Sequence, residues 1–408
     1  MMGFRRMITG SLLAAGLMLF GAAAPALGYP GDFDGDGDVD LSDLAALLGC
    51  YNCCDPDPCW GECEAADFDV SGCVDLSDLA TLLGNYGTSA QPDMVLVAAG
   101  EFEMGDSFGE GNPDELPVHD VYLDAYYIDT YEVTNEEYCV YLNSAYGQGL
   151  IHVSDGVVYK IGGTSYPYCD THSADTDSRI YFSDEEFTIT AGKEDHPMVE
   201  VSWYGAAAYS NWRSDQHGRT PCYNLDTWAC NFDADGFRLP TEAEWEKAAG
   251  WDPAQSRHFR FGEHTDGCGY NCLDGQRANY DSSGDPYETG ARPETTPVGF
   301  YSGDLHYKAD FGWPGSETSY QTQDAQSYYG CRDMSGNVWE WCHDRYDSGY
   351  YTSSPYDNPT GPASGSDRVS RDGYWSDHPS GCRSTSRIMR GPGDCGNTTG
   401  FRCVAGTP

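Results

Sequence analysis

The sequence predicts an α+β fold that is rich in loops and has few helices. Its 408 residues include 49 Gly, 30 Tyr and 22 Pro, a composition typical of chains with many turns rather than of helical bundles. Hydrophobic residues make up 39% of the chain and aromatic residues 13%, so a core can form and wholesale disorder is excluded. Short alternating segments predict strands, and N-cap signals predict the main helices of residues 94–407.

The strands are predicted from the alternation of apolar and polar residues. Residues 95–97 and 100–105 are expected to form two short strands, and residues 120–130 a longer, half-buried one. Ser and Thr at N-caps satisfy amides that the first helical turn leaves unpaired. One predicted helix begins at the N-cap Thr134 and runs to about Ser144. A second begins at Ser202 and includes Tyr209, and a third begins at Thr241 and runs to about Ala249.

The charge balance argues against nucleic acid as a partner. The chain has 22 Lys and Arg against 65 Asp and Glu, which gives a formal net charge of −43. A surface that binds phosphates needs clustered basic residues, and so does one that binds anionic lipids. We therefore expect neither a nucleic acid nor a membrane surface to be the ligand.

The N-terminus has the pattern of a secretory signal peptide. Arg5 and Arg6 precede an apolar segment over residues 8–24, and small residues follow. We expect cleavage after Gly28, with a site after Ala26 as the alternative, and a chain that is secreted, periplasmic or at the cell surface. An uncleaved anchor is the other interpretation, but roughly 17–18 apolar residues fall short of the about 20 that span a bilayer.

Seventeen cysteines in an exported chain predict disulfides. Six of them lie within residues 50–73, and the other eleven are spread to the C-terminus. Because the number is odd, at least one thiol is free or pairs with another chain. A zinc knuckle within residues 50–63 is an alternative that the lack of a nearby His disfavours. The short loops predict the local pairs Cys222–Cys230 and Cys268–Cys272.

Two acidic 12-residue loops lie near the N-terminus, the second 35 residues after the first. Loops of this length supply calcium with oxygen ligands from positions 1, 3, 5, 7, 9 and 12. Gly37 and Gly72 fall at position 6, where the sharp turn needs a residue without a Cβ atom. The predicted calcium ligands are Asp32, Asp34, Asp36, Asp38, Asp40 and Asp43 in the first loop, and Asp67, Asp69, Ser71, Cys73, Asp75 and Asp78 in the second.

An acidic solvated linker is the alternative interpretation of this region. Residues 29–87 hold fourteen Asp and Glu but no Lys or Arg, so without a cation these carboxylates would repel one another. Each loop is followed by one apolar helix, from about Ser42 and Ser77. The pair resembles a type I dockerin, a small helical calcium module that docks onto cohesin domains. The resemblance implies a cohesin-like protein or another cell-surface partner.

Six motifs in the rest of the chain resemble the sulfatase-modifying-factor family, whose type member is the formylglycine-generating enzyme. The resemblance implies a loop-rich variant of the C-type-lectin-like fold. The predicted organisation is a signal peptide over 1–28, a dockerin-like module over 29–87, a linker over 88–93 and a sulfatase-modifying-factor domain over 94–407. The motifs are GEFEMG at Gly100, YEVTNEEY at Tyr131, HPMVEVSWYGAAAYSNW at His196, GFRLPTEAEWEKAAG at Gly236, DMSGNVWEW at Asp333 and GFRC at Gly400.

Several chemically capable residues in these motifs are expected to be structural. Carboxylates in a first helical turn more often interact with the helix dipole than act as catalytic acids. Tryptophans in such motifs more often pack in the core than stack on a sugar, and the His residues have no metal-binding spacing. The residues concerned are Glu242, Glu244 and Glu246; Trp203, Trp245, Trp339 and Trp341; and His119, His196 and His378.

The resemblance also implies two calcium sites in the large domain. Carboxylates and backbone carbonyls are ligands that calcium accepts. The alternative is an Asx-type turn without an ion. The first implied set is Asp333, Gly336, Val338 and Glu340, and the second is Asn279, Tyr280, Asp285 and Tyr287.

Formylglycine-generating enzymes hold copper(I) between two cysteines in a C-x4-C arrangement that follows an R-V-x-x-G-G-S run. In this chain Tyr374 stands at the serine of that run. Alignment without gaps places Asp377 at the first cysteine and Cys382 at the second, whereas alignment backward from Arg387 leaves both cysteines missing. Either way at least one thiolate is lost, and a hard carboxylate cannot replace it as a copper(I) ligand.

The family's disulfides are expected to be absent as well. Ser210 and Ala249 stand at its helix cysteines, so the usual bonds to Cys382 and Cys403 cannot form. We expect a disulfide between Cys382 and Cys395 instead.

Three functions follow from these patterns. The first is a non-catalytic module that binds or displays a glycan or peptide ligand, carried on a calcium-loaded dockerin-like module. The second is an oxidase that converts a sulfatase cysteine to formylglycine and uses copper at an unusual site, with Cys382 as the remnant. The third is a cell-surface assembly component that docks through the dockerin-like module.

Overall fold

The computed structural model describes residues 41–51, 53–54, 73–76, 79, 94–262, 273–289 and 294–407. The chain divides into two compact units, residues 1–92 and 93–408. In the first unit, helix α1 (Leu41–Cys50) begins close to the residue expected from the sequence. Cys54 and Cys73 form a disulfide.

Several predictions lie outside the described residues. They are the signal peptide, the first calcium loop before residue 41, the pair Cys268–Cys272, and Asp67, Asp69, Ser71 and Asp78 of the second calcium loop.

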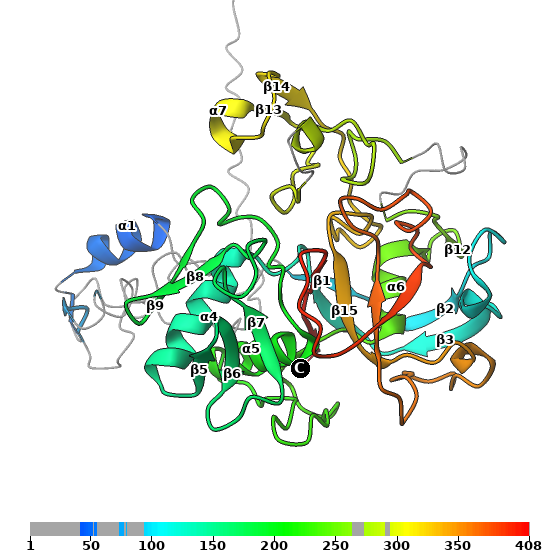
Figure 1. Cartoon of the computed structure of the whole chain (residues 1–408), viewed down its shortest axis with the longest axis horizontal. Coiled ribbons are helices and arrows are strands. Elements are labelled where there is room, and N and C mark those ends of the chain that lie inside the picture. The colour runs from blue at the N-terminus through cyan, green and yellow to red at the C-terminus, as the bar shows by residue number, and fades with distance from the viewer. Residues whose placement is uncertain are drawn as a thin grey trace, which may run out of the picture. The chain divides into compact units, whose positions relative to one another are not determined.

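Two four-stranded sheets form the framework of the second unit (Figure 1). The first sheet is antiparallel and has the order β1-β4-β19-β10, so it joins the beginning of this unit to its end. The second has the order β17-β16-β15-β18, with β15 and β18 parallel. The strands are β1 (Met94–Val97), β4 (Tyr126–Asp129), β19 (Val404–Gly406) and β10 (Phe237–Arg238), then β17 (Arg387–Arg390), β16 (Arg368–Arg371), β15 (Trp339–Arg345) and β18 (Thr399–Gly400).

Hairpins and short helical turns complete this unit. Strand β2 pairs with β3, β5 with β6, β6 with β7, β8 with β9, β11 with β12, and β13 with β14. The strands are β2 (Gly100–Met104), β3 (His119–Leu123), β5 (Ile151–Ser154), β6 (Val157–Lys160), β7 (Pro167–Asp170), β8 (Ile180–Ser183), β9 (Glu186–Ile189), β11 (Trp251–Asp252), β12 (Arg257–His258), β13 (Leu305–Tyr307) and β14 (Ser319–Gln321). The short helices are η2 (Pro113–Glu115), η4 (Pro286–Thr289), η5 (Tyr350–Thr352) and α7 (Lys308–Phe311).

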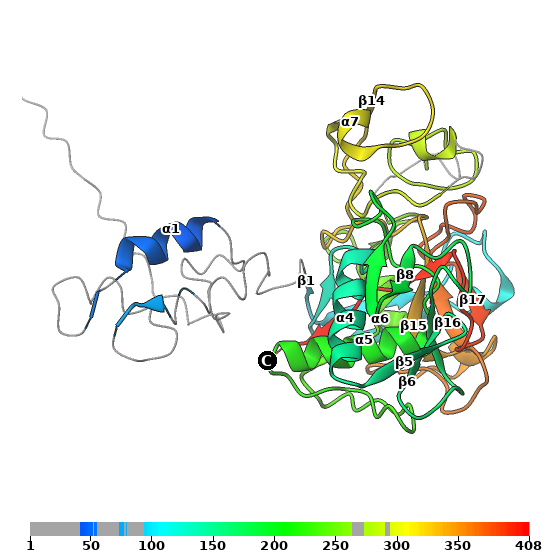
Figure 2. The ribbon, with the colours of Figure 1, turned by 60° about the vertical axis from the view of Figure 1, so that its left-hand side comes forward.

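The three helices predicted from N-caps are all present. They are α4 (Asn135–Gly147), α5 (Trp203–Gln216) and α6 (Glu242–Gly250). Thr134 and Thr241 each accept a hydrogen bond from the amide three residues later, and Ser202 accepts one from Gly205. Helices α4 and α5 lie side by side (Figure 2).

The single strand predicted over residues 120–130 is wrong. The chain forms two strands there, β3 and β4, because each pairs with a different partner: β3 with β2 and β4 with β1. At the break, the amide of Asp124 donates to the side chain of Asn358 (2.9 Å) and leaves the ladder. Alternation alone did not reveal the change of partner.

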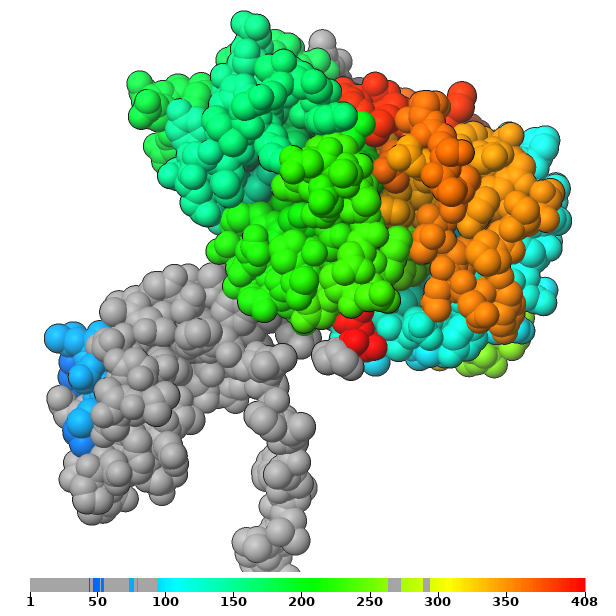
Figure 3. Space-filling view, turned by 90° about the horizontal axis from the view of Figure 1, so that it is seen from below, coloured from blue at the N-terminus to red at the C-terminus, as the bar shows by residue number. Residues whose placement is uncertain are grey.

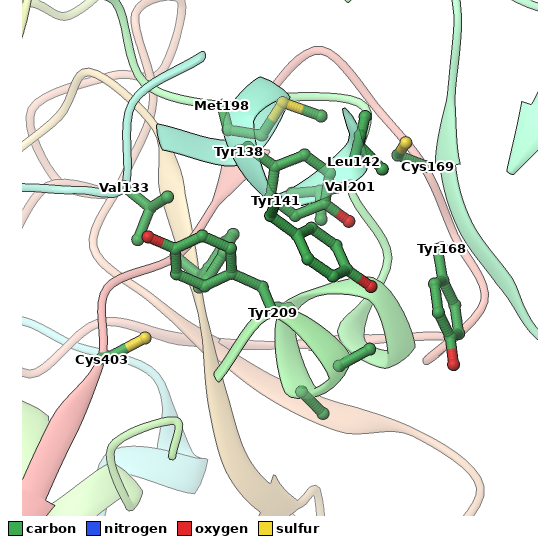
Figure 4. Close-up of a cluster of buried hydrophobic side chains, with 14 of the residues drawn as sticks. Val133, Tyr138, Tyr141, Leu142, Tyr168, Cys169, Met198, Val201, Tyr209 and Cys403 are labelled. Carbon is green, nitrogen blue, oxygen red and sulfur yellow. The ribbon is translucent and has the colours of Figure 1, made fainter. Parts of the chain in front are cut away.

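The core of this unit contains many aromatic side chains. On α4 and α5, the rings of Tyr138 and Tyr209 stack with centroids 5.7 Å apart, beside Tyr141 (Figure 4).

Segments distant in sequence also meet at the surface, where the residues near 200–250 (green) lie beside those near 340–370 (orange) in Figure 3. Phe232 and His343 make one such contact, with ring centroids 4.9 Å apart.

Candidate functional site

Asp377, the residue aligned with the first copper cysteine, is held by a tryptophan of the WEW motif. The side chain is half-buried, and the indole N–H of Trp339 hydrogen-bonds to its carboxylate. Burial raises the pKa of Asp377, while the Trp339 bond and a bond from the His378 amide oppose this rise. The position therefore presents a hard oxygen ligand instead of a soft thiolate.

Tyr374, the residue at the family's serine, lies beside this carboxylate. Burial raises the pKa of Tyr374, and the charge of Asp377 raises it further. Its ring contacts Trp375 edge-on, with centroids 5.5 Å apart. Trp375 is fixed in turn, because its indole N–H donates to the carbonyl oxygen of Asn397 (3.2 Å). A bulky aromatic pair thus stands where the resemblance predicts a small hydroxyl side chain.

Cys382 is buried within a small apolar cluster. The cluster packs the Cys382 side chain against Phe261, Leu273, Ala278 and Tyr280. On another side lies Gly373, where an added Cβ atom would meet the Cys382 sulfur at 2.6 Å. This packing is typical of a structural cysteine, which behaves as a small hydrophobic residue.

The expected disulfide between Cys382 and Cys395 is not formed. The backbone amide of Asp170, the last residue of β7, hydrogen-bonds to the Cys395 sulfur. Cys395 therefore lies beside β7, and its thiol is free of a disulfide.

The disulfide between Cys222 and Cys230 is not formed in the structure either. The two thiols hydrogen-bond to each other, which lowers the pKa of Cys222. The pairing predicted from the short loop is therefore present as a contact between two thiols.

The Ser210 hydroxyl lies 3.4 Å from the Cys403 sulfur. Ser210 therefore occupies the place from which the family's helix cysteine would reach Cys403.

The first implied calcium set contains one carboxylate that accepts from a backbone amide and one that is paired with an arginine. Asp333 is buried, accepts a hydrogen bond from the Gly299 amide (2.5 Å), and has a pKa that burial raises to about 6. Glu340 binds Arg402 through both oxygens, at 2.6 and 2.7 Å, and accepts from the Trp245 indole (2.8 Å). Glu340 is therefore held mainly by Arg402.

Glu132 is a further acidic residue here that the sequence analysis did not single out. Its side chain is buried, Oε1 accepts from the Asn337 side chain (3.0 Å), and Oε2 has no partner. Burial raises the pKa of Glu132 well above its usual range, and the charge of Asp333 raises it further. Glu132, rather than Glu340, thus has an oxygen available beside Asp333. In the sequence it is an acidic residue two positions before the N-cap Thr134, which gives no sign of this environment.

The second implied calcium set divides into two parts. The Asn279 side-chain N–H donates to the carbonyl oxygen of Glu294 (2.9 Å), and its buried Oδ1 has no partner. The Tyr280 hydroxyl donates to the carbonyl oxygen of Leu273 (3.0 Å). Asp285 accepts from the Ser283 hydroxyl (2.6 Å) and the Tyr287 amide (2.7 Å), the geometry of the Asx-type turn.

The glutamates and tryptophans that we expected to be structural are buried. Of the three histidines in the same group, His196 is buried, His119 is half-buried and His378 is exposed. Glu242, Glu244 and Glu246 form ion pairs with Arg387, Arg238 and Arg371. Trp203, Trp245, Trp339 and Trp341 lie in the core. In the part of the chain that the structure describes, no group of three or more His, Cys, Asp or Glu side chains is placed to hold one metal ion. Within that same part, no helix is long and apolar enough to cross a membrane.

The chain is similar to proteins of several kinds. It is 31% identical to the serine/threonine-protein kinase pkn1 of Chlamydia caviae over 316 residues, which cover 77% of this chain and only 38% of that protein. It is 29% identical to the formylglycine-generating enzyme of Streptomyces coelicolor, with 78% and 92% of the two chains covered. It is 26% identical to the inactive C-alpha-formylglycine-generating enzyme 2 of Mus musculus, with 79% and 89% covered.

The fold has a similar solved structure as well. PvdO from Pseudomonas aeruginosa matches with a TM-score of 0.50 and 24% identity, over 78% of this chain and 95% of that one. The mixed α/β, loop-rich fold is therefore shared. The family model for the sulfatase-modifying factor enzyme 1-like domain matches residues 80–407. The chain belongs to the family of sulfatase-modifying factor enzyme 1-like domains.

Proposed function

We propose that this chain is an exported calcium-binding protein whose large domain is non-catalytic and binds or displays a ligand. One observation carries the proposal: the Asp377 carboxylate, held by the Trp339 indole, stands at the position aligned with a copper thiolate. Copper(I) prefers sulfur ligands, so a site with at most one thiolate should bind it orders of magnitude more weakly. Tyr374 adds bulk beside the same carboxylate.

The large domain is a fitting scaffold for display. Loops that connect a rigid framework tolerate variation and commonly carry binding residues. The family includes both formylglycine-generating enzymes and a protein named as inactive, so a non-catalytic role has a precedent among relatives. A glycan or peptide is the ligand class that we propose.

Calcium and export are parts of the same proposal. The Glu132 Oε2 and Asn279 Oδ1 atoms are buried without partners, which suits ligands for a hard cation beside Asp333 and Tyr280. The dockerin-like loops would bind two further ions. The Cys54–Cys73 disulfide supports an oxidising compartment and therefore the signal peptide.

A peptide containing Cys-x-Pro-x-Arg tests the proposal against the oxidase alternative. Full-length protein supplied with copper(I) and oxygen should leave the cysteine unchanged, as read by mass spectrometry. Aldehyde formation that depends on Cys382 would overturn the proposal. The matched variant Asp377→Cys restores a thiolate at one position, so it should bind more copper(I) than the wild type, whereas Ser380→Cys should not.

Two binding experiments distinguish the remaining functions. Glycan-array or peptide-array binding by residues 94–407 supports the display role. Capture of a cohesin-like protein that requires calcium, and that the large domain alone does not reproduce, would favour the assembly role instead.

A further inference from the structure

Glu200 is an acidic residue in an unusual backbone and side-chain environment. Its φ angle is 56°, in the left-handed region that residues with a Cβ atom seldom adopt. The residue is only 2% exposed, and its Oε2 atom is buried without a hydrogen-bond partner. Strained positions that the surrounding structure maintains often lie at ligand sites, so the contacts of this residue matter.

Two backbone hydrogen bonds fix Glu200 between distant segments. Its amide donates to the carbonyl oxygen of Gly396 (3.0 Å), and its carbonyl oxygen accepts from the amide of Asp170 (3.0 Å). Asp170 ends β7 and begins an acidic loop that runs to Asp177. The Glu200 backbone therefore lies beside the start of this loop.

Three aspartates of the loop act on the Glu200 carboxylate. Burial raises the pKa of Glu200 to about 8, and the charges of Asp175, Asp170 and Asp177 add to the rise. Asp175 also raises the pKa of Asp170, after burial. Five other buried carboxylates in this unit are instead paired with arginines: Glu115 with Arg383, Glu242 with Arg387, Glu244 with Arg238, Glu340 with Arg402 and Asp129 with Arg213.

The loop is ordered by its own carboxylates and remains open to solvent. The Asp177 amide donates to Asp175 Oδ1 (2.8 Å), and the Asn397 side chain donates to Asp177 Oδ2 (2.7 Å). Asp175 is exposed, whereas Glu200 is buried.

We propose that Glu200 and the loop Asp170–Asp177 bind one calcium ion. The ligands are hard carboxylate oxygens, and calcium completes six to eight positions with backbone carbonyls and water. We assign Glu200 and Asp175 as the carboxylate ligands, because the Glu200 Oε2 atom is buried without a partner and Asp175 is the exposed carboxylate of the loop. Loop carbonyls and water would supply the remaining ligands. None of these residues belongs to the other calcium sets named above.

The direct test counts calcium ions bound by the full chain in equilibrium dialysis. Glu200→Gln should lower the count by one relative to the wild type, and Asp175→Asn should weaken that ion at least tenfold. Asp344→Asn is the matched control: Asp344 is also 2% exposed with a pKa that burial raises to about 8, but it accepts from the Glu242 amide (2.9 Å). The control should keep the wild-type count. An unchanged count in Glu200→Gln overturns the proposal.

A stability measurement covers the case in which the count is hard to resolve. Glu200→Gln removes an unpaired carboxylate without changing its shape, so in EDTA it should melt at or above the wild-type temperature. In calcium it should melt below the wild type, because the ion is lost. If Glu200 is merely a protonated buried acid, calcium will not change the order of the two proteins. Hydrogen exchange over residues 168–178 should show calcium-dependent protection in the wild type only, and its absence contradicts the assignment.

Discussion

At the residue scale, buried ion pairs connect segments that are far apart in sequence. Glu115 and Arg383 are both buried and share two hydrogen bonds of 2.6 and 2.7 Å. Glu115 also accepts from the Asn112 amide (2.9 Å), which fixes the loop at η2. Loss of one partner would leave a charge buried and uncompensated, which is more costly than the loss of the pair as a whole.

We therefore predict that Arg383→Met destabilises the large domain by about 3–5 kcal/mol. The double variant Glu115→Gln with Arg383→Met should recover a substantial part of the lost unfolding free energy, because no charge is then left unpaired. Urea unfolding at pH 7 measures both values. Lys160→Met is the control, since the Lys160–Asp226 pair is largely exposed and should contribute no more than about 1 kcal/mol. If the two single changes at Glu115 and Arg383 simply add, the pair is not coupled.

Single residues also show what the sequence could not predict. Glu132 lies in the motif YEVTNEEY and Glu200 in the motif that begins at His196, and nothing in either motif distinguishes them from other acidic residues. Their partnerless oxygens depend on which distant segments pack over them, such as the Gly396 segment over Glu200. Tyr374 and Asp377, by contrast, could be singled out from the sequence, because the motif fixed the residue types expected there.

At the scale of elements, helix starts follow from local chemistry. In α6 the Thr241 hydroxyl accepts a hydrogen bond from the Glu244 amide (3.2 Å). The Glu244 carboxylate in turn accepts one from the Thr241 amide (2.7 Å). These contacts span three residues, so the sequence contains all that is needed to predict them. The division between β3 and β4 depends on pairing with β2 and β1, which local alternation does not encode.

We predict that Thr241→Ala destabilises the domain by about 1 kcal/mol, because the N-cap acceptor is lost. Thr241→Ser keeps the hydroxyl and should stay close to the wild type. Thermal or urea unfolding of the two variants provides the comparison. Equal destabilisation by Ser and Ala would show that the methyl group, not the cap, is what matters at this buried position.

At the scale of the whole molecule, the negative charge of the acidic side chains is balanced by nearby arginines in the large domain but not in the N-terminal region. The large domain places many carboxylates against arginines, as at Glu340 and Arg402. Residues 29–87 have fourteen acidic residues and no Lys or Arg at all. The charge of the N-terminal region must therefore be balanced by ions from solution, and at low salt the repulsion within it is strongest.

We predict that residues 29–87 become ordered only when calcium binds. Binding energy is then folding energy, because the ligand oxygens are not brought together in the unfolded segment. Calcium should increase helical circular dichroism and protect the amides of this region, most clearly at low salt. The double variant Asp32→Ala with Asp67→Ala removes the first ligand of each loop, so it should lose both strong sites. Its large domain should unfold at the wild-type denaturant concentration, because its core lies within residues 94–407. Two strong sites that survive in calorimetry of this variant would show that the loops were assigned wrongly.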